Sequence, residues 1–376
     1  MAKSKHKKLR VAFRKNRQKR SRSQNFTRQA LDESARAEDL QTSERLSGKG
    51  ELTRRRTILG TEDEAGPLRN VDESNCLWGR VLSAVGLNSI VRAEDGTQYE
   101  CTVRRVIRTM TRNARNAVVT GDHVLMKPLD NSQGVIERVH PRRGTLSRGA
   151  GRREHILVAN VDQVLVVASA ADPQLKPNLI DRFLVSAEKG EVAAIICINK
   201  IDLVEPAKLQ SIVGIYGRLG YEVVLTSATS SLGISRLQSL LKDCETVLTG
   251  QSGVGKTALL NAVQPGLRLR TGGISNWTRK GRHTTRRATL LELDFGGWVV
   301  DTPGIRQFEL WDVMPEEVEG YFVEFRPFVT LCKFPDCTHT HESSCGVKNA
   351  VERDCIARGR YESYLRMFQG DIAPAK

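Results

Sequence analysis

Residues 250–257, which read GQSGVGKT, constrain the fold of this chain more than any other stretch. Gly250, Gly255, Lys256 and Thr257 fit the pattern G-x-x-x-x-G-K-[ST], between an apolar run, ETVL, and a helical segment, ALLNAV. A strand, a glycine loop and a helix in this order allow successive backbone N–H groups and the helix N-terminus to converge on phosphate. The stretch therefore predicts an α/β domain that binds a nucleotide.

Several positions of this loop have an expected role toward a nucleoside triphosphate. Lys256 would reach the β- and γ-phosphates, and Thr257 would ligate Mg²⁺. DTPG (301–304) ends another apolar run, so Asp301 would hold Mg²⁺ and Gly304 would bring its N–H to the γ-phosphate. Asp-x-Pro-Gly is also ordinary turn chemistry, but its place about fifty residues after the loop favours the phosphate role. We expect phosphate contacts from Gly250, Gln251, Ser252, Gly253, Val254, Gly255, Lys256, Thr257, Ala258 and Gly304.

A second motif, INKID (198–202), has the residues that read guanine. Its aspartate can accept two hydrogen bonds from the guanine N1–H and amine, a donor pair that adenine lacks. Its lysine stem would cover the base, and TSA (226–228), at the end of the next strand, would offer the Ala228 N–H to the guanine O6. In the alternative interpretation Asp202 merely caps a helix. We expect base contacts from Asn199, Lys200, Ile201, Asp202, Ser227 and Ala228.

The order of these motifs is reversed relative to an ordinary GTPase, because here the guanine motifs precede the phosphate loop. Domain termini are often close together, so rejoining an α/β domain at a surface loop preserves its packing. Apolar strands alternate with helical segments, which predicts a mostly parallel sheet covered by helices on both faces. The sequence thus predicts a circularly permuted P-loop GTPase domain over residues 150–312. An ATPase is the rival, and both guanine motifs oppose it.

Two different regions flank the nucleotide-binding domain. Five short β-like runs within residues 73–145 predict a small barrel, for which an OB-fold is the first choice and an SH3-like barrel the alternative. Arginines between Arg104 and Arg115 favour a nucleic-acid surface on it. Residues 313–376 have helical patterns and three of the eight cysteines within fourteen residues. That crowding indicates a metal in a reducing cytosol rather than a disulfide framework.

Residues 1–72 are expected to form a basic, disordered tail and linker. Residues 1–28 hold twelve Lys and Arg and no acid, so most of the net charge of +15 lies there. Such a block cannot bury a core and is free to meet RNA, although a solvated solubility tail is the alternative. The chain has no apolar run long enough for a transmembrane helix and no secretory signal. We therefore expect a cytoplasmic protein with no membrane association.

Several short motifs of the sequence resemble those of the RsgA (YjeQ) family of ribosome-stimulated, circularly permuted GTPases. They are INKIDL (198–203), GQSGVGKT, GRHTT (281–285), DTPG and CKFPDCTHTHESSCGVKNAV (332–351). The permuted motif order, the upstream barrel and the downstream Cys/His segment strengthen the resemblance, which covers about residues 75–370. It implies a multidomain chain with an N-terminal OB-fold barrel, a central permuted α/β P-loop GTPase domain and a C-terminal helical zinc-binding domain.

The resemblance also implies where the catalytic residues lie. Ile305 follows DTPG and cannot orient water by hydrogen bonding, so intrinsic hydrolysis should be slow. The family pattern points to His283 as the group that positions the water, with a plain RNA or phosphate contact as the alternative. Thr284 or Thr285 would close on Mg²⁺ and the γ-phosphate. Together with Lys256, these are the expected catalytic residues.

The Cys/His segment has the spacing of a structural metal site in this resemblance. Cys332, Cys337, His339 and Cys345 offer three thiolates and one imidazole, a closed set that is typical of one structural Zn²⁺ per chain. His341 is the rival for the imidazole, and the family spacing favours His339.

The function that the resemblance implies is hydrolysis of GTP, with Mg²⁺, to GDP and phosphate. The chain would bind the small ribosomal subunit and its rRNA during late maturation, would be stimulated by the ribosome and would act as a monomer. The alternative function is a GTP-switched rRNA-binding scaffold with negligible turnover. Since DTPG feeds into the metal-binding region, the part that moves with nucleotide state is expected beside residues 332–345.

Overall fold

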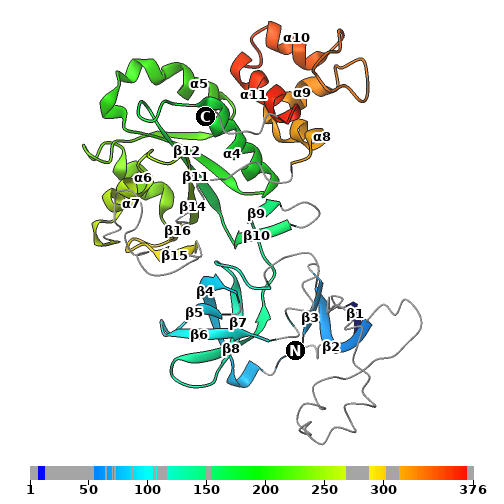
Figure 1. The fold of residues 1–376 in the computed structure, drawn as a ribbon, viewed down its shortest axis with the longest axis vertical. Helices are drawn as coiled ribbons and strands as arrows, with labels where there is room; N and C mark the ends of the chain where they lie inside the picture. The colour runs from blue at the N-terminus through cyan, green and yellow to red at the C-terminus, as the bar shows by residue number, and fades with distance from the viewer. Residues whose placement is uncertain are drawn as a thin grey trace, which may run out of the picture. The chain divides into compact units, whose positions relative to one another are not determined.

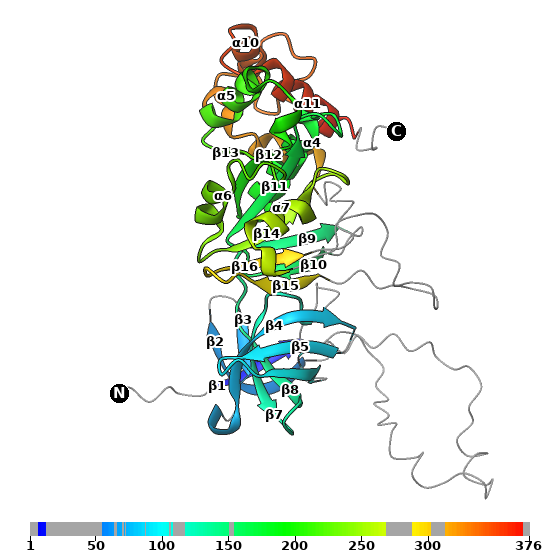
Figure 2. The ribbon, with the colours of Figure 1, turned by 90° about the vertical axis from the view of Figure 1, so that its left-hand side faces the viewer.

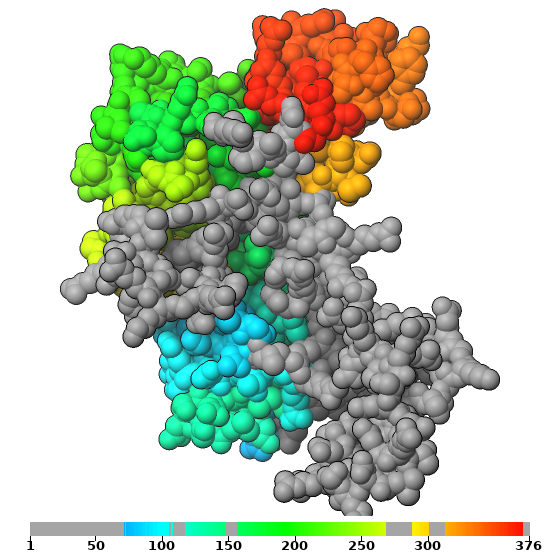
Figure 3. All heavy atoms as spheres, in the orientation of Figure 1, coloured from blue at the N-terminus to red at the C-terminus, as the bar shows by residue number. Residues whose placement is uncertain are grey.

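The structure is a computed structural model that describes most of the chain. It describes residues 7–12, 55–63, 66–69, 71, 73–86, 88–104, 107, 117–149, 154–267, 288–301 and 313–370. Only the backbone is described for residues 7–12, 55–63, 66–69, 148–149, 154–155 and 301; residues with described side chains are coloured in Figure 3. The chain divides into two compact units, residues 1–71 with 108–112 and the remainder.

The first unit contains a three-stranded antiparallel sheet of order β1-β2-β3. Its strands are β1 (Lys7–Ala12), β2 (Arg55–Asp63) and β3 (Gly66–Arg69). In the register of β1 and β2, Leu9 lies opposite Ile58. These strands lie within residues 1–72, for which the sequence predicts a basic, disordered tail and linker, and that assignment stays a prediction. Pairing satisfies their backbone hydrogen bonds, and it does so despite the high density of positive charge.

The second unit begins with a closed five-stranded barrel of order β4-β5-β6-β8-β7 (Figure 1). Its strands are β4 (Leu77–Val85), β5 (Asn88–Ala93), β6 (Gln98–Val103), β7 (His123–Pro128) and β8 (Gln133–Val139). Alternate residues are buried along β5 and β6, as expected for strands that face a core on one side only. The parallel pairing of β6 with β8 marks the Greek-key crossover of an OB-fold, so the barrel prediction is confirmed.

A six-stranded mixed sheet forms the centre of the second unit, in the order β13-β12-β11-β14-β16-β15. Its strands are β11 (Gln163–Ser169), β12 (Ala193–Asn199), β13 (Glu222–Leu225), β14 (Glu245–Thr249), β15 (Thr289–Glu292) and β16 (Trp298–Asp301). All neighbours are parallel except β15, which pairs antiparallel with β16. A hairpin of β9 (Thr145–Gly149) and β10 (Glu154–Ala159) precedes the sheet.

Helices cover both faces of this sheet (Figures 1 and 2). They are α4 (Pro177–Lys189), α5 (Gln210–Arg218), α6 (Ile234–Leu241) and α7 (Lys256–Val263). Along β11, Val164 and Val166 pack with α4 and α5, whereas Leu165 and Val167 pack with α6 and α7. The longest described helix, α4, has 13 residues. Among the described residues no helix combines the length and the apolar character needed to cross a membrane.

The reversed motif order is accommodated by a single seam in the middle of the sheet. The three strands that come first in the chain form one half, and the three that come last form the other. The halves join where β11 pairs with β14, with Val166 opposite Thr249. Because the carboxyl ends of parallel strands share one edge, this seam places the segments after β12, β13, β14 and β16 together.

The C-terminal region is helical, as predicted. Its helices are α8 (Pro315–Val318), α9 (Arg326–Val329), α10 (Gly346–Glu352) and α11 (Arg358–Phe368). Short 3₁₀ turns occur at Glu73–Asn75, Ile201–Leu203, Pro206–Leu209, Pro265–Leu267, Glu319–Tyr321 and Val323–Phe325. The core of the C-terminal region contains Phe322, Phe325 and Tyr364, whose ring centroids lie 5.0–5.6 Å apart.

A buried ion-pair network joins this region to the sheet domain. Arg360 of α11 donates to Asp181 of α4 at 2.7 Å and to both carboxylate oxygens of Glu324, at 2.6 and 3.0 Å. Tyr216 of α5 donates to the same Asp181 oxygen at 2.7 Å. Burial disfavours the charge of Arg360, but Asp181 and Glu324 together raise its pKa above the ordinary value. Since an unpaired buried charge is very costly, the network fixes α11 against α4.

Candidate functional site

The phosphate loop follows β14 and leads into α7, at the carboxyl edge of the sheet. Gly250 has a φ of 136°, and a Cβ there would overlap the carbonyl oxygen of Val167. Gly255 has a φ of 93°, and a Cβ there would lie 2.5 Å from Nδ2 of Asn199. Both positions need glycine because a side chain would meet backbone or the guanine motif. The close approach of the loop to β11 and β12 therefore depends on these two residues.

Lys256 lies at the first turn of α7 and closes the loop on itself. Its Nζ donates hydrogen bonds to the carbonyl oxygens of Gly250, at 2.7 Å, and of Gln251, at 2.8 Å. The ammonium group is thus held against the backbone of the phosphate loop. Thr257 follows it and is half-buried in the same turn.

The NKxD motif is tied directly to the phosphate loop. Asn199, the last residue of β12, is almost fully buried and donates from Nδ2 to the carbonyl oxygen of Val254 at 2.9 Å. Its Oδ1 accepts a hydrogen bond from Thr226 at 3.2 Å. Lys200 follows in the left-handed conformation, with φ 62°, and its Nζ donates to the carbonyl oxygen of Asp172 at 2.6 Å. The backbone of Asp172 is a contact that no sequence pattern indicates.

The second guanine loop meets the first at Asp202. The exposed Asp202 carboxylate is hydrogen-bonded by the buried Ser227, which lowers the pKa of Asp202 below its usual value, with smaller contributions from Thr229 and Lys200. The N–H of Ile201 donates to the carbonyl oxygen of Thr226 at 3.2 Å. The 3₁₀ turn that contains Asp202 begins after Lys200, and the helical segments that follow begin after Glu205 and Leu209, so Asp202 is the N-cap of none of them. The capping interpretation of Asp202 is therefore not supported.

The structure thus brings together the phosphate loop, the NKxD motif and the TSA motif. Of the DTPG motif it describes only the first residue. Asp301 is the last residue of β16, next to β14 at the same edge, and only its backbone is described. His283, Thr284, Thr285, Gly304 and Ile305 lie outside the described residues.

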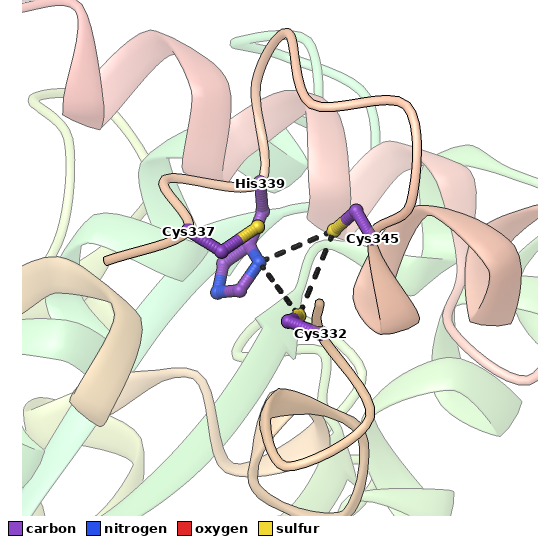
Figure 4. Close-up of side chains that lie close together, drawn as sticks. All are labelled: Cys332, Cys337, His339 and Cys345. Atoms are coloured by element: carbon purple, nitrogen blue, oxygen red, sulfur yellow. Dashed lines mark hydrogen bonds between the residues drawn. The ribbon is translucent and has the colours of Figure 1, made fainter. Parts of the chain in front are cut away.

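The candidate metal centre is built from the loops around α9 and α10. The ligand atoms of Cys332, Cys337, His339 and Cys345 all lie within 4.8 Å of one another, and Figure 4 shows them turned toward a common point. His339 Nδ1 lies 3.5 Å from the Cys332 sulfur and 3.3 Å from the Cys345 sulfur. Metal–ligand bonds of about 2.0–2.3 Å in a tetrahedron require ligand separations of roughly 3.5–3.8 Å. The donor set and its spacing therefore fit a metal ion.

Neighbouring groups orient the imidazole of His339. Its Nε2 lies 3.2 Å from Oε2 of Glu319, at ion-pair distance but without the geometry of a hydrogen bond, while its Nδ1 faces the thiols of Cys332 and Cys345. Tyr361 donates to the His339 carbonyl oxygen at 2.6 Å, which fixes the backbone. His341 is exposed, its ring bonds Thr340, and it is absent from the metal-ligating group found among the described residues. The geometry thus favours His339 over His341. Glu319 carries no sequence signal of this role.

Replacing Glu319 with glutamine is expected to lower metal affinity about tenfold, because an acidic outer partner helps to hold the ring of a ligating histidine in place. Competition with a chromophoric zinc chelator would measure the affinity. Glu316→Gln is the matched control, since Glu316 is exposed in α8. Equal affinities for the two variants would contradict the role of Glu319.

Comparisons with known proteins agree with this geometry. The RsgA GTPase family model matches residues 139–311. A small ribosomal subunit biogenesis GTPase RsgA from Alkaliphilus metalliredigens is 40% identical over 276 residues, which cover 73% of this chain and 90% of the relative. The protein of the same description from Thermotoga petrophila is 42% identical over 278 residues, again covering 73% and 90%.

Two solved structures are also similar. The crystal structure of YjeQ from Thermotoga maritima has a TM-score of 0.66 and 38% identity, and the match covers 80% of this chain and all of that one. The crystal structure of YloQ, described as a circularly permuted GTPase, has a TM-score of 0.62 and 29% identity, covering 82% and 100%.

Proposed function

Because this chain belongs to the RsgA family of circularly permuted small ribosomal subunit biogenesis GTPases, we propose that it binds the small ribosomal subunit and hydrolyses GTP there during late maturation. GTP hydrolysis is the activity of the family. The observation that carries the proposal is the hydrogen bond from Asn199 to Val254, which joins the guanine motif to the phosphate loop across the permuted seam. It supports one nucleotide site built from both halves of the chain.

In this proposal the two halves divide the recognition of GTP. The phosphates lie on residues 250–258, where the glycine loop and the N-terminus of α7 supply N–H groups and Lys256 supplies the positive charge. The base lies against residues 199–202, and Asp202 accepts hydrogen bonds from the guanine N1–H and amine. This acceptor role requires an ionised carboxylate, which an aspartate has at neutral pH, and the hydrogen bond from Ser227 lowers the pKa of Asp202 further. Ser227 and Ala228 complete the base site.

Hydrolysis is assigned to the phosphate end of the same site. Thr257 and Asp301 would hold Mg²⁺, which when bound neutralises charge that develops on the phosphates. Gly304 would donate its N–H to the γ-phosphate. His283 would position the attacking water, a task that Ile305 cannot perform, and Thr284 or Thr285 would close over the site. β14 and β16 are parallel neighbours, so Asp301 at the end of β16 lies at the same sheet edge as the phosphate loop that follows β14. This supports the role of Asp301.

The metal centre is proposed to hold one structural Zn²⁺. Three thiols and one imidazole form a closed set with no position left for a substrate. A bound ion would cross-link the loops that carry these four residues. The role is therefore to fold the C-terminal region and not to take part in hydrolysis.

The barrel and the basic N-terminal segment are the proposed contacts to rRNA. An OB-fold of this class commonly binds oligonucleotides. The positive charge of residues 1–28 would add salt-dependent affinity for the phosphate backbone. The chain is proposed to act as a monomer.

Turnover of GTP should rise at least about tenfold when purified small ribosomal subunits are added, because completion of a deficient site by a partner accelerates GTPases strongly. Large subunits are the control and should have little effect. Equal rates with and without small subunits would refute stimulation. Negligible turnover with every particle, together with RNA binding that still depends on GTP, would favour the scaffold function instead.

A further inference from the structure

A cluster that links the barrel to the sheet has no role in the functions above. Trp298, the first residue of β16, is contacted by two arginines of the barrel: the guanidinium carbons of Arg80 and Arg92 lie 5.4 and 5.6 Å from its ring centroid. Arg80 also forms an ion pair with Glu245, and Arg92 one with Glu292. We call these five residues the tryptophan clamp.

The registers of the two sheets align the members of the clamp. Arg80 on β4 and Arg92 on β5 are directly opposite each other in the barrel. Trp298 on β16 is directly opposite Glu245 on β14 and Glu292 on β15. A row of glutamate, tryptophan and glutamate therefore meets a pair of arginines. The two rows match in both charge and spacing.

The barrel alone gives no reason for its arginine pair. Like charges directly opposite on neighbouring strands are destabilising. Here each guanidinium is compensated by one carboxylate and by the face of the same indole, which attracts cations. All three compensating groups belong to the nucleotide-binding domain, so the pair favours contact with that domain over a free barrel surface.

The strands that carry the clamp residues of the sheet extend to the sheet edge at which the nucleotide motifs lie. Trp298 and Asp301 are the two ends of the four-residue strand β16, roughly 10 Å apart at 3.3 Å per residue. Glu292 ends β15, whose first residue, Thr289, pairs with Asp301. Glu245 begins β14, which leads into the phosphate loop. A second barrel contact lies near the start of β15, where Thr120 donates to the Ala288 carbonyl oxygen at 3.2 Å.

We propose that Trp298, with Arg80 and Arg92, is a positioning group for GTP hydrolysis, through which the barrel fixes strand β16, which carries Asp301, and its neighbour β15. The clamp meets the guanine-reading half at the amino ends of β11 and β14, where the Glu245 N–H donates to Asp162 Oδ2 at 2.8 Å, and among the described residues its ring contacts and ion pairs involve none of residues 199–202. Its loss should therefore lower kcat and leave KM for GTP nearly unchanged. If the interface had a purely structural role, its loss would lower the free energy of unfolding and would not lower kcat selectively over KM.

The test measures steady-state GTP hydrolysis by the full chain. Trp298→Leu is expected to lower kcat about tenfold, the factor that corresponds to cation–π and ion-pair terms of a partly buried cluster. Arg92→Gln should lower kcat about threefold, because Arg92 and Glu292 are the more exposed pair. KM and the affinity for a fluorescent GTP analogue should stay within about twofold in both variants.

The barrel contains a matched control of the same chemistry. Arg138 lies 5.4 Å from the Trp78 ring and pairs with Glu73 at 2.6 Å. Trp78→Leu and Arg138→Gln should leave kcat unchanged, because among the described residues the ring contacts and ion pair of this cluster involve no residue of the six-stranded sheet.

A charge exchange keeps the proposal testable if Trp298→Leu does not fold. The double variant Arg92→Glu with Glu292→Arg restores the ion pair and returns an arginine near the indole, so it should recover most of the kcat that Arg92→Gln loses. The proposal is overturned if kcat in the clamp variants falls no further than in the Trp78 and Arg138 controls. It is also overturned if KM rises in proportion to the loss of turnover, or if the exchange recovers nothing.

Discussion

Replacing Lys256 with alanine is expected to lower kcat/KM for GTP about a thousandfold. In the structure the Lys256 ammonium is held at the centre of the phosphate loop by the carbonyl oxygens of Gly250 and Gln251. A charge held there needs little reorganisation when a triphosphate binds. Loss of one preorganised electrostatic donor at a site of developing negative charge costs about a hundred- to a thousandfold, and the ground-state phosphate contact is lost as well.

Phosphate release by the variant and its affinity for a fluorescent GTP analogue would check this expectation. Lys256→Gln separates charge from folding, because its amide still offers a donor to the loop carbonyls but carries no charge. The Lys256→Gln variant should have the Tm of the wild type, and it should lose nearly as much kcat/KM for GTP as Lys256→Ala. Lys208→Ala, at an exposed position, should behave as the wild type. A Lys256→Ala variant that retains more than about a tenth of the wild-type turnover would exclude the phosphate role.

The motifs of the nucleotide site could be predicted from the sequence because each is local. Gly250 and Gly255 lie in one loop and are required by backbone conformation, which leaves a linear pattern. The apolar run ETVL before the phosphate loop lies in β14, and β12 ends at Asn199, the first residue of the NKxD motif. The family resemblance, the α/β sheet and the helical C-terminal region with its Cys/His cluster were also predicted from local patterns, and they are confirmed.

Features that depend on distant contacts could not be predicted in this way. The spacing of the barrel strands suits an OB-fold and an SH3-like barrel equally, and only the parallel pairing of β6 with β8 separates them. The short edge strand β15 has four residues and no clear period. Trp298 and Arg80 are 218 positions apart and carry no motif, so nothing in the sequence relates them. The same holds for Arg360 and Asp181.

The Arg360 network bears on which part of the molecule moves. The sequence suggests that the region around residues 332–345 follows the switch segments, because DTPG leads toward it. In the structure Arg360 fixes the C-terminal helix α11 to Asp181 of α4, and α4 connects β11 to β12 in the guanine-reading half. A buried pair of this kind resists separation. We therefore expect α11 to stay with α4 and the base site in both nucleotide states.

Replacing Asp202 with asparagine is expected to exchange the base preference from guanine to xanthine. The Asp202 carboxylate, with its lowered pKa, offers two acceptor oxygens to the two donors of guanine. Asparagine has nearly the same shape but replaces one acceptor by a donor, which leaves the guanine amine facing an N–H group. Xanthine carries a carbonyl in place of that amine and can accept the new hydrogen bond. A site built to pair a substrate group rejects a mismatched analogue by several orders of magnitude, and we expect about a thousandfold loss for GTP.

Competition between GTP and xanthosine triphosphate in a turnover assay measures this exchange directly. The wild type should prefer GTP, and the variant should use xanthosine triphosphate at a rate close to that of the wild type with GTP. Such recovery cannot come from a damaged fold, because a damaged site would lose both nucleotides. Glu205→Gln, three residues further along and exposed, should keep the preference for GTP. If Asp202→Asn also keeps that preference, residues 198–202 do not read the base, and the hydrogen bond from Asn199 to Val254 would then serve only to hold the two halves of the sheet together.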